Sequence, residues 1–166
     1  MTELISIEEL KRLAAKLKLH GLLVHWDELS EQEIPLIKTW LHWEETEGKK
    51  RGLERRLGQA HLGRFKPLSD FDWDWLERGD KDTVSDMMQL DFIAEATNII
   101  LMGPNGVGKS TIAQNIAYQS VMQGHTALFV EASQMLGDLA AQDGDNALRR
   151  RIKHYVQPSV LVIDLC

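Results

Sequence analysis

The stretch Gly103-Pro-Asn-Gly-Val-Gly-Lys-Ser110 constrains the fold more than any other part of the chain. It matches G-x-x-x-x-G-K-[ST] at every fixed position, and an apolar run at 98–102 precedes it. The backbone amides of such a loop, together with the N-terminus of the next helix, form an anion site. We therefore predict a strand at 98–102, a phosphate-binding loop at 103–110 and a helix at 111–123.

Each residue type in this loop has a predicted task. Gly106 and Gly108 let the backbone turn its amides inward without a Cβ clash. Lys109 supplies a positive charge for the β- and γ-phosphates of a nucleotide, and Ser110 offers its hydroxyl to Mg²⁺. The predicted phosphate contacts are Gly103, Pro104, Asn105, Gly106, Val107, Gly108, Lys109 and Ser110.

Two further apolar runs, at 126–131 and 160–164, predict strands that alternate with helices at 133–141 and 145–157. This alternation predicts an α/β fold with a parallel sheet. Asp164 ends the last strand and is the candidate ligand for Mg²⁺, although a core strand can also simply end in a turn-forming aspartate.

Hydrolysis of the nucleotide requires a group beside the metal that positions or deprotonates water. The neighbour of Asp164 is Leu165, which cannot polarise water. Glu131, at the end of the 126–131 strand, is the nearest positional alternative, but we favour the interpretation that it only ends that strand. We therefore expect nucleotide binding with poor hydrolysis or none.

The first half of the chain has a different pattern, typical of an all-α region. Ser6 and Glu9 have the spacing of a capping box, and apolar stripes at helical spacing follow. The stretch 67–75 is acidic and aromatic, which indicates a linker. We therefore predict two domains, an all-α N-terminal region at 1–78 and a nucleotide-binding core at 79–166.

A basic segment at 49–66 carries seven Lys or Arg and one Glu, in a chain whose formal net charge is −6. It could contact a DNA backbone without reading bases, or it could be a solvated helix face or pair with the acidic stretch 70–77. The candidate DNA-contacting residues are Lys49, Lys50, Arg51, Arg55, Arg56, Arg64 and Lys66.

The tryptophans all lie in the N-terminal region, at positions 26, 40, 43, 73 and 75. Stacking on bases is possible, but we expect them to pack inside a small helical domain. The six histidines show no paired metal spacing, so we assign them no role.

Composition limits the location of the chain. The single cysteine, Cys166, leaves no internal disulfide, which is typical of a reducing cytoplasm. The charged, amphipathic start lacks a signal-peptide core, and no window approaches the roughly 18 consecutive apolar residues of a membrane span. We therefore expect a cytoplasmic protein without membrane contact.

Four stretches resemble the IstB-like family of ATP-binding transposition helpers, close to the DnaC-type helicase loaders within the AAA+ class. They are LKRLAAKLKLHGL, KKRGLERRLGQAHLGRFKPLSDFDW, LDFIAEATNIILMGPNGVGKS and GHTALFVEASQMLGDL. Transporter and SMC-type ATPases share the sequence of this loop, but they place a long insertion between the loop and the metal strand. Here 55 positions separate Lys109 from Asp164, which suits the AAA+ type.

This resemblance implies that Gly103 to Thr111 bind ATP, that Asp164 is the metal-strand aspartate, and that position 165 should be acidic. It also implies DNA, a transposase and further copies of the full-length protein as partners. A helicase loader, whose partner is a replicative helicase, and a non-catalytic DNA- or partner-binding remnant are the alternatives.

The resemblance further implies a fourth strand between the loop strand and the metal strand, followed by arginine and sensor residues. This chain ends at Cys166, so we expect an incomplete, apparently C-terminally truncated P-loop core. Either a gap should remain beside the metal strand or the sheet should pair differently.

Overall fold

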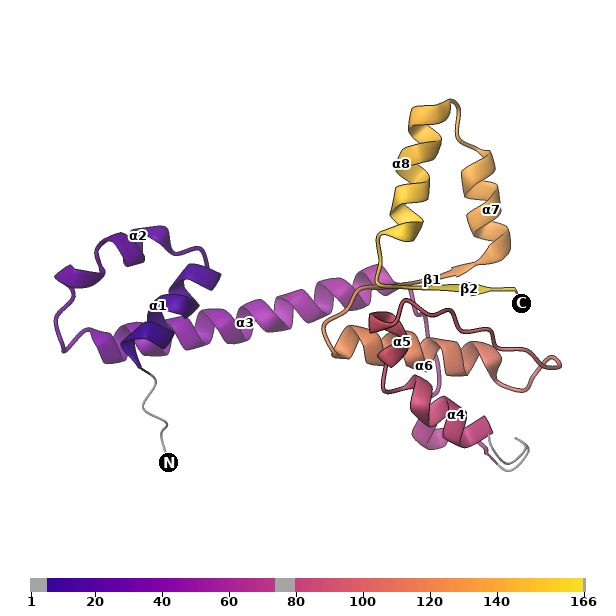
Figure 1. The fold of residues 1–166 in the computed structure, drawn as a ribbon, viewed down its shortest axis with the longest axis horizontal. Coiled ribbons are helices and arrows are strands. Elements are labelled where there is room, and N and C mark those ends of the chain that lie inside the picture. The colour runs from indigo at the N-terminus through magenta and orange to yellow at the C-terminus, as the bar shows by residue number, and fades with distance from the viewer. Residues whose placement is uncertain (1–5, 74–79, 166) are drawn as a thin grey trace. The chain divides into compact units, whose positions relative to one another are not determined.

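A computed structural model describes residues 6–73 and 80–165. The chain divides into two compact units, an N-terminal unit at Met1–Gly52 and a C-terminal unit at Leu53–Cys166 (Figure 1). The division falls inside one long helix, α3. The functional boundary that we predicted near residue 78 lies outside the described residues and stays a prediction.

The N-terminal unit is entirely helical in its described residues. It contains α1 (Ile7–Lys16), α2 (His20–Val24), the 3-10 turn η1 (Trp26–Glu28) and the first part of α3 (Ile34–Ala60). The predicted capping box is confirmed, because Ser6 Oγ accepts from the Glu9 amide and the Glu9 carboxylate accepts from the Ser6 amide. The core consists of Leu10, Ala14, Trp26, Ile37 and Leu41.

The tryptophans behave differently from one another. Trp26 is buried in the N-terminal core, as predicted, and Trp73 is half-buried with its ring against Phe71. The packing prediction is wrong for Trp40 and Trp43, which are 55% and 60% exposed. The reason is their position, because Ile37 and Leu41 already supply the inward face of α3. Trp75 lies outside the described residues.

The C-terminal unit combines helices with a small sheet. Its described elements after α3 are η2 (Leu68–Asp70), α4 (Asp80–Met87), α5 (Asp91–Ala94), α6 (Lys109–Met122), β1 (Ala127–Glu131), α7 (Ala132–Ala140), α8 (Asp145–Val156) and β2 (Val160–Asp164). The strands at 126–131 and 160–164 and the helix after the loop are therefore confirmed within a residue or two.

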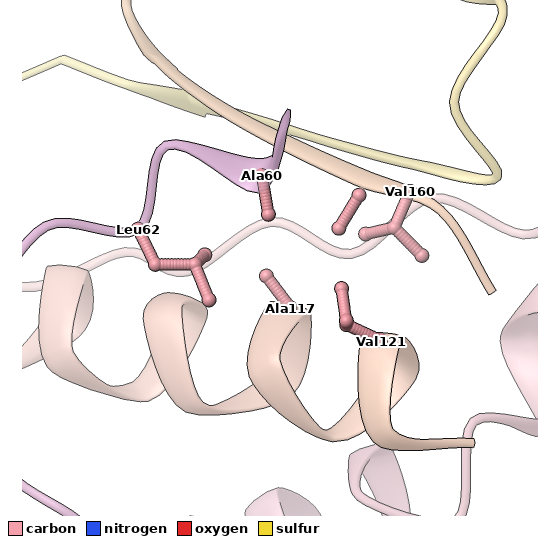
Figure 2. Close-up of a cluster of buried hydrophobic side chains, with 6 residues drawn as sticks. Ala60, Leu62, Ala117, Val121 and Val160 are labelled. Atoms are coloured by element: carbon pink, nitrogen blue, oxygen red, sulfur yellow. The ribbon is translucent and has the colours of Figure 1, made fainter. Parts of the chain in front are cut away.

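The sheet consists of β1 and β2, which pair in parallel with Ala127 opposite Val160 and Glu131 opposite Asp164. Figure 1 shows α6 on one side of this sheet and α7 and α8 on the other. Ala127 and Val160 pack against Ala117 and Val121 of α6, as Figure 2 shows for the labelled members. The alternate residues of the strands, including Leu128 and Val130, pack with Tyr155 on the opposite face.

The strand predicted at 98–102 is wrong, because residues 97–104 have no regular structure. Among the described residues β2 pairs with β1 alone, so this apolar segment finds no strand to pair with. Extended residues become a strand only through bonds to a neighbour. Ile100 and Met102 are consequently 80% and 87% exposed. We expected either a gap beside the metal strand or a different pairing of the sheet, and the structure shows the gap. The predicted parallel sheet is therefore confirmed only in part.

Candidate functional site

The predicted phosphate loop meets the N-terminus of α6. Gly108 is the residue before the helix, and its carbonyl accepts the first helical bond from the Ile112 amide at 2.9 Å. Lys109, Ser110 and Thr111 form the first turn of α6, whose leading amides have no partner within a helix and can bind an anion. The structure therefore places Gly103 to Gly108 directly before α6 and Lys109 to Thr111 in its first turn.

Two glycines of this loop adopt a backbone conformation that other residues rarely reach. Gly106 has φ of +85° and Gly108 has φ of +88°. The two differ in their surroundings. A Cβ atom at Gly108 would lie 2.4 Å from Cε2 of Phe71, whereas a Cβ at Gly106 would meet nothing within 4 Å. Gly108 is thus required both by its conformation and by the ring packed against it.

Phe71 reaches the loop because the segment before it is fixed along α6. The buried Asn115 donates to the carbonyl oxygens of Lys66 and Thr111, both at 2.8 Å, and accepts from the Leu68 amide at 3.2 Å. Gln114 donates to the Leu62 carbonyl at 2.8 Å. The stretch that we predicted as a linker therefore packs, in its described part, on the helix that carries the phosphate loop.

Lys109 lies over the loop that precedes it. Its Nζ donates to the carbonyl oxygens of Gly103 at 3.0 Å and Pro104 at 2.9 Å. These neutral acceptors hold the ammonium group close to the loop amides. A phosphate in the loop would compete for the same group, and a charged acceptor forms the stronger bond.

A groove of about 560 Å³ opens between the irregular segment at 97–101 and β2. Its apolar wall includes Ile99, Leu101 and Ile163, and its polar lining includes Lys109, Ser110 and Asp164. The gap beside β2 and three of the predicted site residues, Lys109, Ser110 and Asp164, therefore belong to one cavity, whereas the loop residues 103–108 do not line it. Asp164 enters it because β2 ends there, and Ser110 enters it from the first turn of α6.

The polar lining suits a magnesium ion that arrives with a nucleotide. Ser110 and Asp164 both line this groove, and hydroxyl and carboxylate oxygens are ligands that Mg²⁺ prefers. Within residues 6–73 and 80–165 there is no group of three or more His, Cys, Asp or Glu side chains that could hold a metal alone. Such a pair fits an ion that completes its shell with phosphate oxygens and water.

Leu165 occupies the position at which a catalytic base was expected, and its side chain cannot act as one. It lines the groove and is 88% exposed. Glu131 is the direct strand neighbour of Asp164 in the β1–β2 register. It also precedes the first residue of α7 and makes no side-chain capping bond there. The structure thus places Glu131 beside Asp164, the predicted metal ligand, a proximity that the sequence suggested only by position.

The predicted DNA-contacting residues are divided between the two units. Lys49, Lys50 and Arg51 belong to the N-terminal unit, where Lys49 pairs with Glu45 at 3.1 Å and Arg51 with Glu44 at 3.7 Å. Arg55, Arg56, Arg64 and Lys66 belong to the C-terminal unit, and all except Arg56 are exposed. Part of the basic segment is therefore engaged with carboxylates of its own helix.

A second cationic surface lies on α8, and the sequence reasoning missed it. Arg149, Arg150 and Lys153 are exposed on this helix. The signal was present in the run Arg149-Arg-Arg-Ile-Lys-His154, but the average charge of the chain and the stronger run at 49–66 obscured it. Arg150, Arg151 and His154 also line a small cavity of about 200 Å³ between α8 and Gln142 of the segment after α7.

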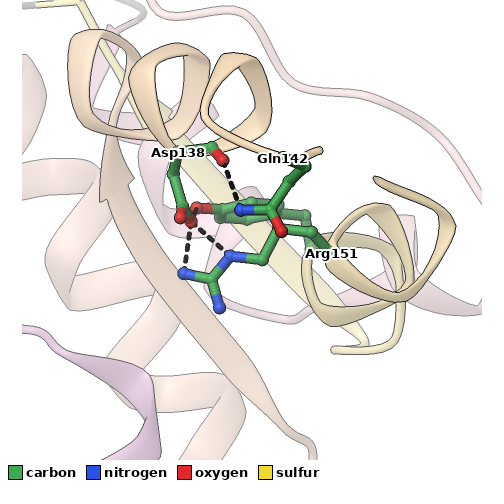
Figure 3. A network of polar contacts seen from close by, with 4 residues as sticks. Asp138, Gln142 and Arg151 are labelled. Carbon is green, nitrogen blue, oxygen red and sulfur yellow. Dashed lines mark hydrogen bonds and ion pairs between the residues drawn. The ribbon is translucent and has the colours of Figure 1, made fainter. Parts of the chain in front are cut away.

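A polar network fixes α8 against α7 (Figure 3). The Asp138 carboxylate accepts from Tyr155 Oη at 2.5 Å and pairs with the Arg151 guanidinium, while Gln142 donates to the Asp138 carbonyl at 2.8 Å. The Tyr155 hydrogen bond, followed by that of Arg151, holds the pKa of Asp138 below its usual range. Burial, followed by the contact with Asp138, raises the pKa of Tyr155.

This network predicts a pH-dependent contribution to stability. Because the pKa of Asp138 is lowered in the folded chain, its contribution is present above the unfolded pKa, about 4, and is lost as pH falls through the folded value. Asp138→Asn should therefore lower the urea midpoint at pH 7, and the deficit should shrink below about pH 4. Urea unfolding of both proteins between pH 3 and 8 measures this, and a deficit independent of pH would contradict it.

Comparison with known proteins shows the family of the chain. The family described as IstB-like ATP binding protein matches residues 12–166, so the chain belongs to that family. An insertion sequence IS21 protein of Pseudomonas aeruginosa, named as ATP-binding, is 30% identical over 165 residues. Similarly named proteins of Geobacillus stearothermophilus (insertion sequence IS5376) and Mycobacterium tuberculosis are 27% and 32% identical over 124 and 112 residues.

These matches cover 95%, 75% and 68% of this chain, respectively. The matched parts span 62%, 49% and 45% of the lengths of the three relatives. The recognised family is therefore confirmed, and with it an ATP-binding class associated with insertion sequences. In the part of the chain that the structure describes, no helix is long and apolar enough to cross a membrane.

Proposed function

We propose that this chain is the ATP-binding helper of a DNA transposition system. The observation that carries the proposal is the convergence of Lys109, Ser110 and Asp164 on one groove at the N-terminus of α6. The relatives add the biological setting, because their names place them in insertion sequences. Those names favour a transposition helper over a helicase loader.

ATP would bind with its phosphates in the loop at 103–110. The loop amides and the first turn of α6 would cradle them, and Lys109 would exchange its two carbonyl acceptors for phosphate oxygens. Ser110 and Asp164 would hold Mg²⁺ together with those phosphates. The ion would neutralise phosphate charge, while the residues of this chain hold and orient the nucleotide.

Turnover of the bound ATP should be slow. Leu165 offers no proton acceptor after Asp164, and we expect Glu131, the strand neighbour of Asp164, only to end β1. Water must be oriented or deprotonated for attack on the γ-phosphate. The role that follows is nucleotide-dependent assembly rather than rapid hydrolysis. The direct test of ATP recognition is equilibrium binding of labelled ATP to the chain and to a Lys109→Ala variant.

The helper role also requires contact with DNA, which we assign to the basic segment and to the cationic surface of α8. Neither arrangement contains a base-reading pattern, so the binding should be independent of sequence. The remaining partners would be a transposase and further copies of the full-length protein, all in the cytoplasm. The N-terminal helical unit, which lies outside the nucleotide site, would supply the partner contacts.

DNA binding should depend steeply on salt. Five phosphate contacts give a slope of about −4.5 in a plot of log K against log salt, and loss of three contacts reduces its magnitude by about 2.7. We expect that reduction for each of two triple variants. The first combines Arg55→Gln, Arg64→Gln and Lys66→Gln, and the second combines Arg149→Gln, Arg150→Gln and Lys153→Gln. Anisotropy of a labelled random-sequence duplex at several salt concentrations measures the slope.

Lys18→Gln provides the control for this measurement, because Lys18 is exposed in the N-terminal unit outside both cationic surfaces. Its slope should equal that of the unaltered chain. Triple variants with unchanged slopes would remove the assignment of these surfaces to DNA.

A further inference from the structure

An exposed apolar stripe runs along the first turns of α3. Leu36, Trp40 and Trp43 are 52%, 55% and 60% exposed and follow one another at i, i+4 and i+7. This spacing places the three side chains on one face of a helix. We refer to Leu36, Trp40 and Trp43 as the aromatic stripe.

The aromatic stripe is not needed for the core of the N-terminal unit. The inward face of α3 is formed by Ile37 and Leu41, which are buried with Leu10, Ala14 and Trp26. The two faces of α3 are therefore both apolar, and only one of them is covered within this unit. Tryptophan is enriched among residues that dominate binding energy at protein interfaces, and clustered exposed apolar residues mark interaction sites.

The charges around the aromatic stripe indicate the chemistry of its occupant. Residues 31–48 contain five glutamates and a single lysine, Lys38. Glu47 lies one turn beyond Trp43 on the same face, and Glu44 borders it. Both carboxylates are exposed, and Glu44 also pairs with Arg51 of the same helix at 3.7 Å. A nucleic acid would bring phosphates against these carboxylates, whereas Lys or Arg on a protein partner would complement them.

A second copy of this chain is a poorer occupant. Suppose that two copies pair their aromatic stripes in antiparallel fashion about a two-fold axis at Trp40. A residue a given number of positions before Trp40 in one copy then lies opposite the residue the same number of positions after Trp40 in the other copy. Glu33 lies directly before α3, and its carboxylate accepts from the Ser30 amide at 2.8 Å and from the Ser30 hydroxyl at 2.6 Å. It would then lie near Glu47 of the other copy at both ends of the interface. Like charges placed in this way disfavour the pairing.

We infer that the aromatic stripe is a docking surface for an amphipathic helix of a partner protein, with an apolar face bordered by basic residues. Leu36, Trp40 and Trp43 supply the apolar contact, and Glu44 and Glu47 select the basic border. This inference rests on the partner contact proposed for the N-terminal unit and does not depend on the nucleotide site.

The test uses the full chain and three fluorescein-labelled probes, which are an 18-residue amphipathic Leu/Lys peptide, its Leu/Glu counterpart and a 20-nucleotide oligo-dT. The Leu/Lys peptide should bind and the Leu/Glu peptide should not. Trp40→Ala with Trp43→Ala should weaken Leu/Lys binding at least tenfold, because both changes remove interface anchors. Glu44→Gln with Glu47→Gln should weaken it less and reduce its salt dependence.

Val24→Ser is the matched control, because it removes an apolar side chain that is 77% exposed elsewhere in the same unit. It should leave peptide binding unchanged. The inference is overturned if the unaltered chain does not bind the Leu/Lys peptide, or if the tryptophan variant binds it equally well. It is also overturned if the tryptophan changes abolish oligo-dT binding or self-association on gel filtration instead.

Labelled ATP binding by the same variants separates this inference from the nucleotide site. All of them should bind ATP like the unaltered chain, since none of the changed residues lies in the C-terminal unit. Loss of peptide binding with retained ATP binding therefore concerns the aromatic stripe alone. Circular dichroism should show unchanged helix content, because the altered side chains are largely exposed.

Discussion

A Gly108→Ala variant should be far less stable than a Gly106→Ala variant, although both glycines have nearly the same backbone conformation. Each substitution places a side chain at a positive φ, +85° or +88°, which costs roughly 1–2 kcal/mol. Only the methyl group at position 108 would also lie 2.4 Å from the Phe71 ring. Displacing that ring should add about 1–3 kcal/mol.

Urea unfolding of the two variants measures this difference. Phe71→Ala provides the further control, because removal of the ring should bring the cost of Gly108→Ala close to that of Gly106→Ala. The coupling between positions 71 and 108 is then read from a double-mutant cycle. Equal destabilisation by the two glycine variants, or no coupling to Phe71, would show that the ring does not pack against the loop.

Local sequence signals predicted the elements that depend on neighbours in the chain. The capping box of Ser6 and Glu9 identified the start of α1, and the apolar runs identified β1 and β2. The glycine pattern predicted the loop and the helix that follows it. In each case the residues that form the structure lie within a few positions of one another.

Other features depended on contacts that the sequence does not show. The run at 98–102 has the composition of a strand, but a strand requires a partner beside it, and β2 does not supply one. Gly48 and Gly52, residues of low helix propensity, lie inside α3, which continues through both. Trp40 and Trp43 differ from Trp26 only in which helical face they occupy once Ile37 and Leu41 have formed the core.

The candidate site also combines residues that local sequence patterns indicate with contacts that they do not. The motif predicts Gly103 to Ser110 as phosphate contacts by spacing alone, and the position of Asp164 at the end of β2 indicates a metal ligand; both assignments stay predictions. The contact of Phe71 with Gly108 was not predictable, because it requires the segment at 62–71 to be fixed along α6 through Gln114 and Asn115. Such bonds join residues about 50 positions apart, which local pattern cannot reveal.

The central claim is that the loop before α6 binds the phosphates of ATP, and Lys109 provides the largest expected effect on it. Its ammonium group would form charge-assisted bonds to phosphate oxygens, worth about 1.5–3 kcal/mol each. Two such bonds correspond to a weakening of about 100-fold or more when the side chain is removed. Lys153→Ala removes an exposed lysine from α8 in the same unit and is the matched control.

Equilibrium dialysis with labelled ATP and Mg²⁺ on the unaltered chain, Lys109→Ala and Lys153→Ala is the most direct measurement. Unfolding midpoints of the three proteins establish that each is folded under the conditions used. The account predicts saturable binding by the unaltered chain and by Lys153→Ala, with binding lost in Lys109→Ala. Equal binding by all three proteins, or negligible binding by all three, would contradict it.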